Sequence, residues 1–162
     1  MALISFNQSG ALLWRKDGDE DAPVNAPRLV GFDGLSDSDA PETLALHIDT
    51  ETSFAALADI PDALAGVAID FPKFNDGRGF SLAVRLRKDF AYRGEIRAIG
   101  HVIPDQALFL LRAGFDSAEV PPQRLDAFAA ALKRFPAFYQ TDVRGQISVA
   151  HRRHTARATA AE

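Results

Sequence analysis

Three consecutive strand-and-helix patterns occupy residues 65–132 and restrict the fold more than any other feature of the sequence. Each begins with a short apolar run typical of a buried strand and continues into apolar residues spaced as on one face of a helix. The expected strands are 66–70, 95–102 and 117–120. Such units imply parallel strands, and right-handed crossovers bring the carboxyl ends of these strands to one edge of the sheet. We therefore expect an α/β fold, as an open sheet or a partial barrel, with any ligand site at that edge.

The helices of these units have recognisable ends. The first is expected over 77–90, beginning within two residues of Gly77, because only that register buries Leu82, Leu86 and Phe90 and keeps the neighbouring arginines out of the core. The second follows Asp105, expected as its N-cap, and closes at Gly114. Two prolines at 121–122 open the third, whose apolar face runs to residue 132.

The part before residue 65 is expected to be small, mixed and rich in β-structure. Apolar runs at 2–6 and 11–14 around the turn-like 7–10 predict a hairpin. Further strands are expected at 28–32 and 44–48, and a helix over 53–64 interrupted at Pro61. Together these segments predict one domain over 1–140, with 65–140 as its regular core. The stretch 141–162 lacks periodicity and is expected to be a mobile tail, so deletion after Gln140 should leave the fold intact.

Composition excludes several classes of chemistry. The chain has no cysteine, which removes disulfides, thiolate nucleophiles, iron–sulfur clusters and cysteine-type zinc sites. His151 and His154 lack an acidic partner, and we expect no metal site and no cofactor. No apolar run is long enough to cross a membrane, and the first residues lack the basic region of a signal peptide, so a cytoplasmic protein is expected. An acidic pI of about 5.5 disfavours nucleic acid as a partner.

Charge is divided unevenly along the chain. Residues 1–70 carry thirteen acidic and three basic side chains, whereas residues 71–162 carry nine acidic and fifteen basic ones. The basic half favours an anionic ligand or an acidic partner surface, unless the two halves are interleaved in space.

One segment combines features of an anion site. Between the first parallel strand and its helix, glycines flank an arginine at the expected helix start, where free N–H groups and the helix dipole favour an anion. The expected anion-binding residues are Asp76, Gly77, Arg78, Gly79, Ser81, Arg85 and Arg97. In the alternative interpretation, Arg85 pairs with Asp89, Asp76 caps the helix, and the glycines serve only the turn. The sequence is compatible with both interpretations.

Three titratable residues fall near the ends of the parallel strands. Asp70, His101 and Glu119 are placed where α/β units converge on substrates, and Asp70 and His101 are the candidate acid and base groups. Each also has an ordinary structural role available to it. The nucleophile elbow, the phosphate-binding P-loop, the H-E-x-x-H motif and a dinucleotide fingerprint after a strand are all missing from the sequence.

Several short motifs together resemble a known family. They are FPKF at 71–74, DGRGFS at 76–81, LR at 86–87, GEIRAIG at 94–100, DQ at 105–106 and GFD at 114–116. Over residues 65–140 the chain is similar to the bacterial domain-of-unknown-function family 934. The resemblance implies a supporting role in assimilatory sulfite reduction, because family members are commonly encoded beside the sulfite reductase haemoprotein. It implies no catalytic residue, and the chain has no flavin, nicotinamide, sirohaem or cluster motif.

Two hypotheses of different classes follow. In the first, the protein is a non-catalytic accessory that docks on the sulfite-reduction machinery, with the reductase haemoprotein as its partner. In the second, it is a small α/β enzyme or carrier for an anionic metabolite. The arginines and Ser81 would then bind a small oxyanion with millimolar to high-micromolar affinity, and Asp70 or His101 would move protons.

Overall fold

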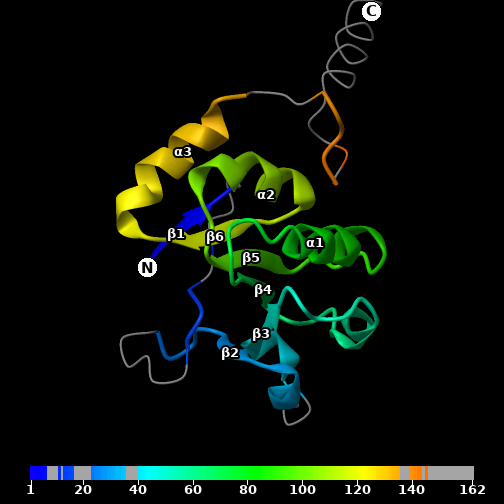
Figure 1. The fold of residues 1–162 in the computed structure, drawn as a ribbon. Helices are drawn as coiled ribbons and strands as arrows, with labels where there is room; N and C mark the ends of the chain where they lie inside the picture. Colours follow the sequence, from blue (N-terminus) through cyan, green and yellow to red (C-terminus); the bar gives the residue numbers. More distant parts are fainter. Residues whose placement is uncertain are drawn as a thin grey trace, which may run out of the picture.

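The computed structural model describes residues 1–6, 11, 13–16, 23–35, 40–135, 139–143 and 145. Within these residues, six strands form one sheet (Figure 1): β1 (Ala2–Ser5), β2 (Arg28–Val30), β3 (Leu44–Asp49), β4 (Gly66–Phe71), β5 (Glu95–Gly100) and β6 (Ser117–Val120). They lie in the order β1-β6-β5-β4-β3-β2. Strands β2 to β6 are parallel to their neighbours, and β1 is antiparallel to β6. The expected α/β fold with parallel βα units is confirmed.

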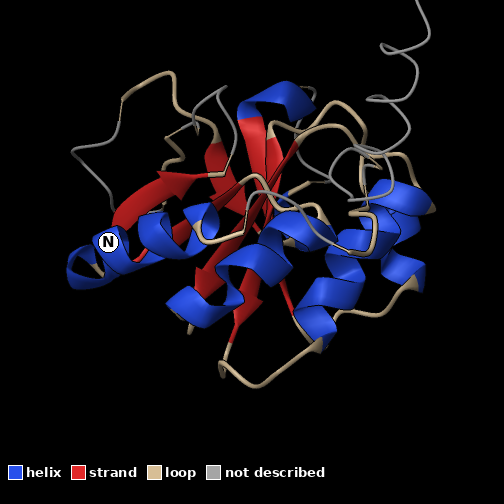
Figure 2. Cartoon of the chain, turned by 90° about the horizontal axis from the view of Figure 1, so that it is seen from above, coloured by secondary structure: helices blue, strands red, loops and turns tan. Residues whose placement is uncertain are grey.

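The helices cover one face of this sheet. Strands β2 to β6 lie side by side in the order in which they occur along the chain, so every crossover advances in the same direction. Crossovers that share one handedness then place their helices on the same face of the sheet. The helices are α1 (Arg78–Lys88), α2 (Ala107–Ala113) and α3 (Leu125–Lys133). All three bury side chains in one core with β3 to β6, and Figure 2 shows the helices gathered mainly on one side of the strands. On the opposite face, Trp14 packs with Ala45, Ala68 and Ile99 in a second, smaller apolar cluster.

The expected register of α1 is largely confirmed. The helix begins at Arg78, and Leu82 and Leu86 are fully buried against the sheet. Each fully buried leucine contributes about 1.5–3 kcal/mol through removal of apolar surface from water. Phe90 is only partly buried, contrary to expectation, because α1 ends two residues earlier at Lys88.

The predicted N-terminal hairpin is wrong. β1 pairs with β6, with Leu3 opposite Glu119, at one edge of the sheet. Arg15 instead pairs with Arg28 beside β2, at the other edge. Trp14, at the end of the second run, lies over Arg97 of β5, so the two runs do not pair with each other. Short apolar runs indicate strands without indicating their partners. Residues 7–10, the expected turn, lie outside the described residues.

Two other local predictions need correction. The segment 53–64 forms only the short 3-10 helix η3 (Ala55–Asp59), in keeping with Pro61, which cannot donate a helical hydrogen bond. Asp105 does not cap α2, because the 3-10 turn η4 (Pro104–Gln106) precedes the helix and the Gln106 side chain accepts a hydrogen bond from the Ile103 N–H at 3.1 Å. The remaining 3-10 turns are η1 (Phe32–Gly34), η2 (Pro41–Thr43) and η5 (Pro122–Arg124).

Packed residues continue past Gln140. Asp142 is buried, and the Val143 N–H donates to the Arg112 carbonyl at 2.9 Å, just before α2 ends. These contacts extend the packed part to at least Val143, beyond the expected boundary at 140. The rest of the expected tail, from residue 146, lies outside the described residues. No helix in the described part of the chain has the length and apolar character needed to cross a membrane.

Candidate functional site

The loops after β3 and β4 bring Thr50, Asp76 and Arg78 together at the carboxyl edge of the sheet. The Arg78 guanidinium donates to Asp76 through Nε at 3.0 Å and Nη2 at 2.8 Å. The Thr50 hydroxyl donates to the same carboxylate at 2.7 Å. Hydrogen bonds from Arg78 and then from Thr50 hold the pKa of Asp76 well below its usual range, and the bond to Asp76 raises the pKa of Arg78. Arg78 is therefore already paired with a carboxylate.

A hollow of about 230 Å³ lies beside this pair. Arg78 and Ser81 both line it, so the structure brings these two expected site residues together. Glu51 lines it as well, with a carboxylate oxygen 3.7 Å from the Arg78 guanidinium. An anion in this hollow would compete with Asp76 and Glu51 for the same cation.

The other expected members at the start of α1 have structural partners. Arg85 pairs with Asp89 at 2.8 Å and lies over the Phe54 ring at 4.5 Å. The Asp76 carboxylate also accepts from the Arg78 backbone N–H at 3.1 Å, as a residue just before a helix commonly does. Gly77 is the N-cap residue, and a Cβ on Gly79 would lie 2.6 Å from the Phe71 ring, so close packing of α1 on β4 requires this glycine.

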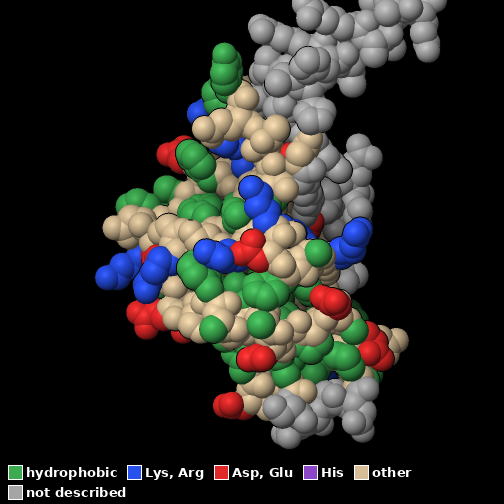
Figure 3. Space-filling model, turned by 90° about the vertical axis from the view of Figure 1, so that its right-hand side faces the viewer, with side chains coloured by type: hydrophobic (Ala, Val, Ile, Leu, Met, Phe, Trp, Pro, Cys, Tyr) green, Lys and Arg blue, Asp and Glu red, His purple; other side chains and the backbone are tan. Residues whose placement is uncertain are grey.

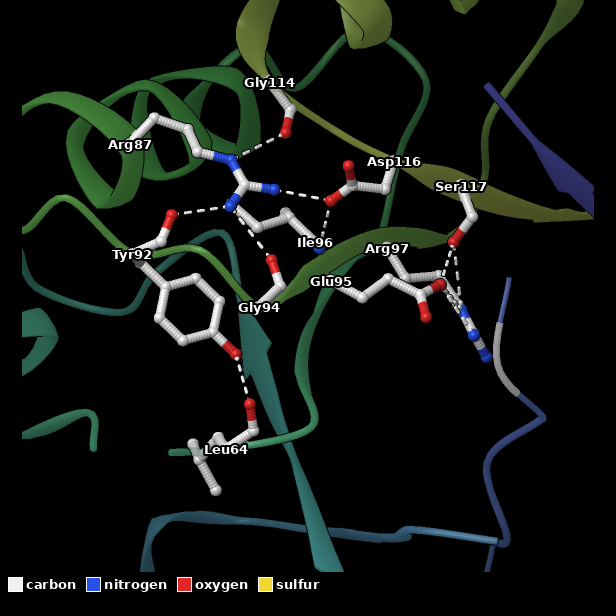
Figure 4. Close-up of polar contacts among 10 residues, drawn as sticks. All are labelled: Leu64, Arg87, Tyr92, Gly94, Glu95, Ile96, Arg97, Gly114, Asp116 and Ser117. Atoms are coloured by element: carbon white, nitrogen blue, oxygen red, sulfur yellow. Dashed lines mark hydrogen bonds and ion pairs between the residues drawn. The ribbon is translucent and has the colours of Figure 1, made fainter. Parts of the chain in front are cut away.

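Arg97 lies apart from this group, on the sheet face away from the helices. Its side chain is 2% exposed and contacts Glu95 at 2.8 Å and Ser117 at 3.2 Å, as Figure 4 shows. Glu119 lies 3.7 Å away, and the Trp14 ring covers the guanidinium at 3.6 Å from its centroid. Arg97 thus joins two carboxylates beneath a tryptophan, and no part of it contributes to the hollow at Arg78.

The candidate acid and base groups Asp70 and His101 each have a different neighbour in the structure. His101 is exposed after β5, and its backbone N–H donates to the Phe71 carbonyl at 2.7 Å. Asp70 lies instead 3.5 Å from the Nε2 atom of His47 on the neighbouring strand β3. Sequence reasoning missed His47, although alternation in an expected strand places it on the same face as Asp49, the register partner of Asp70.

Arg87 forms a second network that sequence reasoning missed. Its guanidinium donates to three carbonyls, those of Gly114 at 3.0 Å, Tyr92 at 2.6 Å and Gly94 at 2.9 Å, and pairs with the Asp116 carboxylate (Figure 4). This nearly buried arginine ties the end of α1 to the starts of β5 and β6.

The same network explains several of the motifs on which the resemblance to the family rests. Asp116 also accepts from the Ile96 N–H at 2.9 Å, and the Tyr92 hydroxyl donates to the Leu64 carbonyl at 3.1 Å. Gly114 closes α2 as expected, with φ of 98°, a conformation that favours glycine. A Cβ there would also lie 2.7 Å from the Arg87 side chain. The motifs at 86–87, 94–100 and 114–116 therefore meet in one structural network.

An apolar groove runs between α1 and α2 and is closed by residues 140–143. It encloses about 650 Å³. We call it the α1–α2 groove; its side chains include Phe80, Val84 and Lys88 from α1 and Phe109, Arg112 and Ala113 from α2. Phe109 is 60% exposed and also borders a second hollow of about 280 Å³ on its other side. Sequence reasoning missed this groove, because Phe109 lies within a run of apolar residues in its helix.

Comparison with known proteins gives a family assignment. The family described as a bacterial protein of unknown function (DUF934) matches residues 45–150. The chain belongs to this family. No curated protein and no solved structure matches it. The DUF934 match begins in β3 and spans all three helices, so it includes the Arg87 network, the α1–α2 groove and the Arg78 hollow, but neither β1 nor Trp14.

Proposed function

We propose that this DUF934 protein is a non-catalytic accessory protein that docks on another protein through the α1–α2 groove. The observation that carries the proposal is the exposure of Phe109 between two hollows. An exposed apolar patch of this kind is typical of protein–protein contact sites. Figure 3 shows hydrophobic side chains reaching the surface among Lys and Arg side chains on one side of the molecule.

The shape and charge of the groove support a protein partner. Phe80, Val84 and Lys88 stand four residues apart on α1, so they form one stripe along the groove wall. Lys88 is an exposed basic position beside the apolar floor, whereas Arg112 donates to Gln140 at 2.8 Å and Asp142 is a buried acidic residue of the lining. A partner segment with apolar anchors and acidic flanks would complement both features.

The state of the candidate chemical groups also supports a non-catalytic role. Arg78 is bonded to Asp76, Arg85 to Asp89, and Arg97 to Glu95. These ion pairs occupy the cations that an anionic substrate would need. The described residues hold no group of three or more His, Asp or Glu side chains placed to bind a metal ion.

The partner we propose is the assimilatory sulfite reductase haemoprotein, which the resemblance to DUF934 implies. The test is binding of purified reductase haemoprotein to the wild-type chain and to Phe109→Asp. A fully buried phenylalanine contributes about 1.5–3 kcal/mol, so the variant should bind roughly tenfold to a hundredfold more weakly. Phe54→Asp is the matched control, because Phe54 is also exposed and lies outside the groove. Equal binding by both variants, or absence of binding by the wild type, would refute the proposal.

A second candidate function is a small enzyme or carrier for an anionic metabolite. It is favoured by one observation, the hollow at the carboxyl edge that Arg78 and Ser81 share. Titration of the wild type, Arg78→Ala and Arg85→Ala with sulfate, sulfite and phosphate separates the two functions. A response that disappears in Arg78→Ala and persists in Arg85→Ala, whose arginine does not line the hollow, favours the carrier. Equal responses of all three proteins rule this site out.

A further inference from the structure

Two arginines lie side by side at the amino end of β2 and line a hollow that shares no residue with the hollows described above. Arg15 pairs in parallel with Arg28, the first residue of β2. The Arg15 N–H donates to the Pro27 carbonyl at 2.8 Å, and the Leu29 N–H donates to the Arg15 carbonyl at 2.8 Å. Paired residues of neighbouring strands lie about 4.8 Å apart with their side chains on the same face. Both arginines line one hollow of about 380 Å³.

The two guanidinium groups have no countercharge in the part of the chain that the structure describes. The first 70 residues hold only three basic side chains against thirteen acidic ones. Of these three, Lys16 pairs with Glu119 at 2.8 Å. Neither Arg15 nor Arg28 takes part in an ion pair with a described residue. Like charges held opposite each other are unfavourable, and an anion between them would remove the repulsion.

The rest of the hollow is polar enough for such a ligand. Asn25 adds an amide to its wall, and Thr43 adds a hydroxyl. Leu44, the first residue of β3, completes the side nearest the sheet. Guanidinium groups bind phosphate-like oxygens through paired N–H donors, so two adjacent arginines fit a ligand with several negative oxygens.

We propose that this hollow, the Arg15–Arg28 site, binds a small tetrahedral oxyanion of the phosphate or sulfate type. This site lies at the amino ends of the strands, because Arg28 and Leu44 begin their strands. The Arg78 hollow lies at the carboxyl ends, because Thr50 follows the end of β3. The site is also independent of the α1–α2 groove. Two charge-assisted contacts in an open hollow correspond to millimolar to high-micromolar affinity.

The test is an NMR titration of the full chain with inorganic phosphate, against chloride at matched ionic strength. Amide shifts should be confined to the neighbourhood of Arg15, Asn25, Arg28 and Thr43. Arg15→Gln and Arg28→Gln should each weaken binding roughly tenfold or more. Arg93→Gln, which removes an exposed arginine outside every hollow described here, is the matched control and should bind as the wild type does. Arg78→Gln detects binding at the carboxyl ends of the strands. Without phosphate, both variants should unfold cooperatively near the wild-type midpoint, which excludes a folding defect. Phosphate should then raise the thermal unfolding midpoint of the wild type more than that of either Arg15→Gln or Arg28→Gln.

Several outcomes overturn the proposal. Absence of phosphate-specific shifts in the wild type does so, and so does a response that both glutamine variants retain. A response lost only in Arg78→Gln assigns the ion to the Arg78 hollow instead. A fourth variant replaces the acidic residues between the two arginines, Asp17, Asp19, Glu20 and Asp21, by their amides. If phosphate binds only to this variant, the chain's own carboxylates neutralise the pair, and no external ligand is needed.

Discussion

Removing the Asp116 carboxylate tests the Arg87 network directly. The side chains of Arg87 and Asp116 are 8% and 13% exposed. Asp116→Ala removes this carboxylate from the guanidinium, which keeps its three carbonyl contacts, and it deprives the Ile96 N–H of its carboxylate acceptor. Breaking a buried ion pair by removing one partner costs about 3–5 kcal/mol. Because the carbonyl contacts remain, we expect the lower value, about 3 kcal/mol of unfolding free energy.

A pair on the surface of the same helix provides the control. Arg85 and Asp89 also form an Arg–Asp pair, but their side chains are 50% and 46% exposed. Asp89→Ala should therefore lower the unfolding free energy by only roughly 0.3–0.5 kcal/mol. In thermal terms, Asp116→Ala should lower the melting temperature by about 6–12 °C, since each kcal/mol corresponds to about 2–4 °C in a chain of this size.

The assay is urea unfolding monitored by far-ultraviolet circular dichroism. The comparison requires that the free energy of unfolding depend equally steeply on urea concentration in all variants. Asp116→Asn, which keeps an acceptor and loses the charge, should fall between the wild type and Asp116→Ala. If Asp116→Ala and Asp89→Ala differ by less than about 1 kcal/mol, the buried network does not stabilise the fold as argued.

Three further predictions concern other parts of the structure. Because the folded pKa of Asp76 is lowered, its contribution to stability is complete above about pH 4 and is lost as the pH falls below that, so Asp76→Asn should reduce the difference between urea unfolding at pH 7 and at pH 3. Burial raises the pKa of Tyr92, so stability should fall as the pH rises above about 10, and Tyr92→Phe should remove part of that fall in alkaline unfolding experiments. A chain that ends at Gln140 should unfold cooperatively but about 1 kcal/mol less stably than one that ends at Gly145, because it lacks the buried contacts just beyond 140; equal calorimetric midpoints would contradict this.

The parts of the fold that sequence predicted are those set by local spacing. Periodicity placed α1 within one residue of its observed start, and Gly114 marked the end of α2 because only a left-handed residue closes a helix in this way. The parallel strands followed from the repeated βα order. Pairings between distant segments were not predicted, because β1 and Trp14 have no local feature that identifies their partners in β6 and β5.

The candidate site shows the same division. The Asp76 carboxylate accepts from a backbone N–H two residues away, and Arg85 pairs with Asp89 four residues away, so sequence reasoning could include both local contacts in its alternative interpretation. Arg97 was expected at an anion site because a strand arginine is ordinarily exposed, yet Trp14 covers it from 83 residues away in the chain. Long-range packing of this kind decides which cations remain available to a ligand, and it cannot be predicted from composition.

The position of β1 has a consequence for how the chain folds during synthesis. Its four residues are synthesised well before their partner β6, which begins only at Ser117. At about 5–20 residues per second, a ribosome needs about 6–23 s to add the intervening residues. Throughout that interval the parallel strands can assemble one after another, whereas the first segment has no strand to pair with. The sheet is therefore completed by a segment that was synthesised before all of the parallel strands, and β1 stays available to chaperones until β6 has emerged.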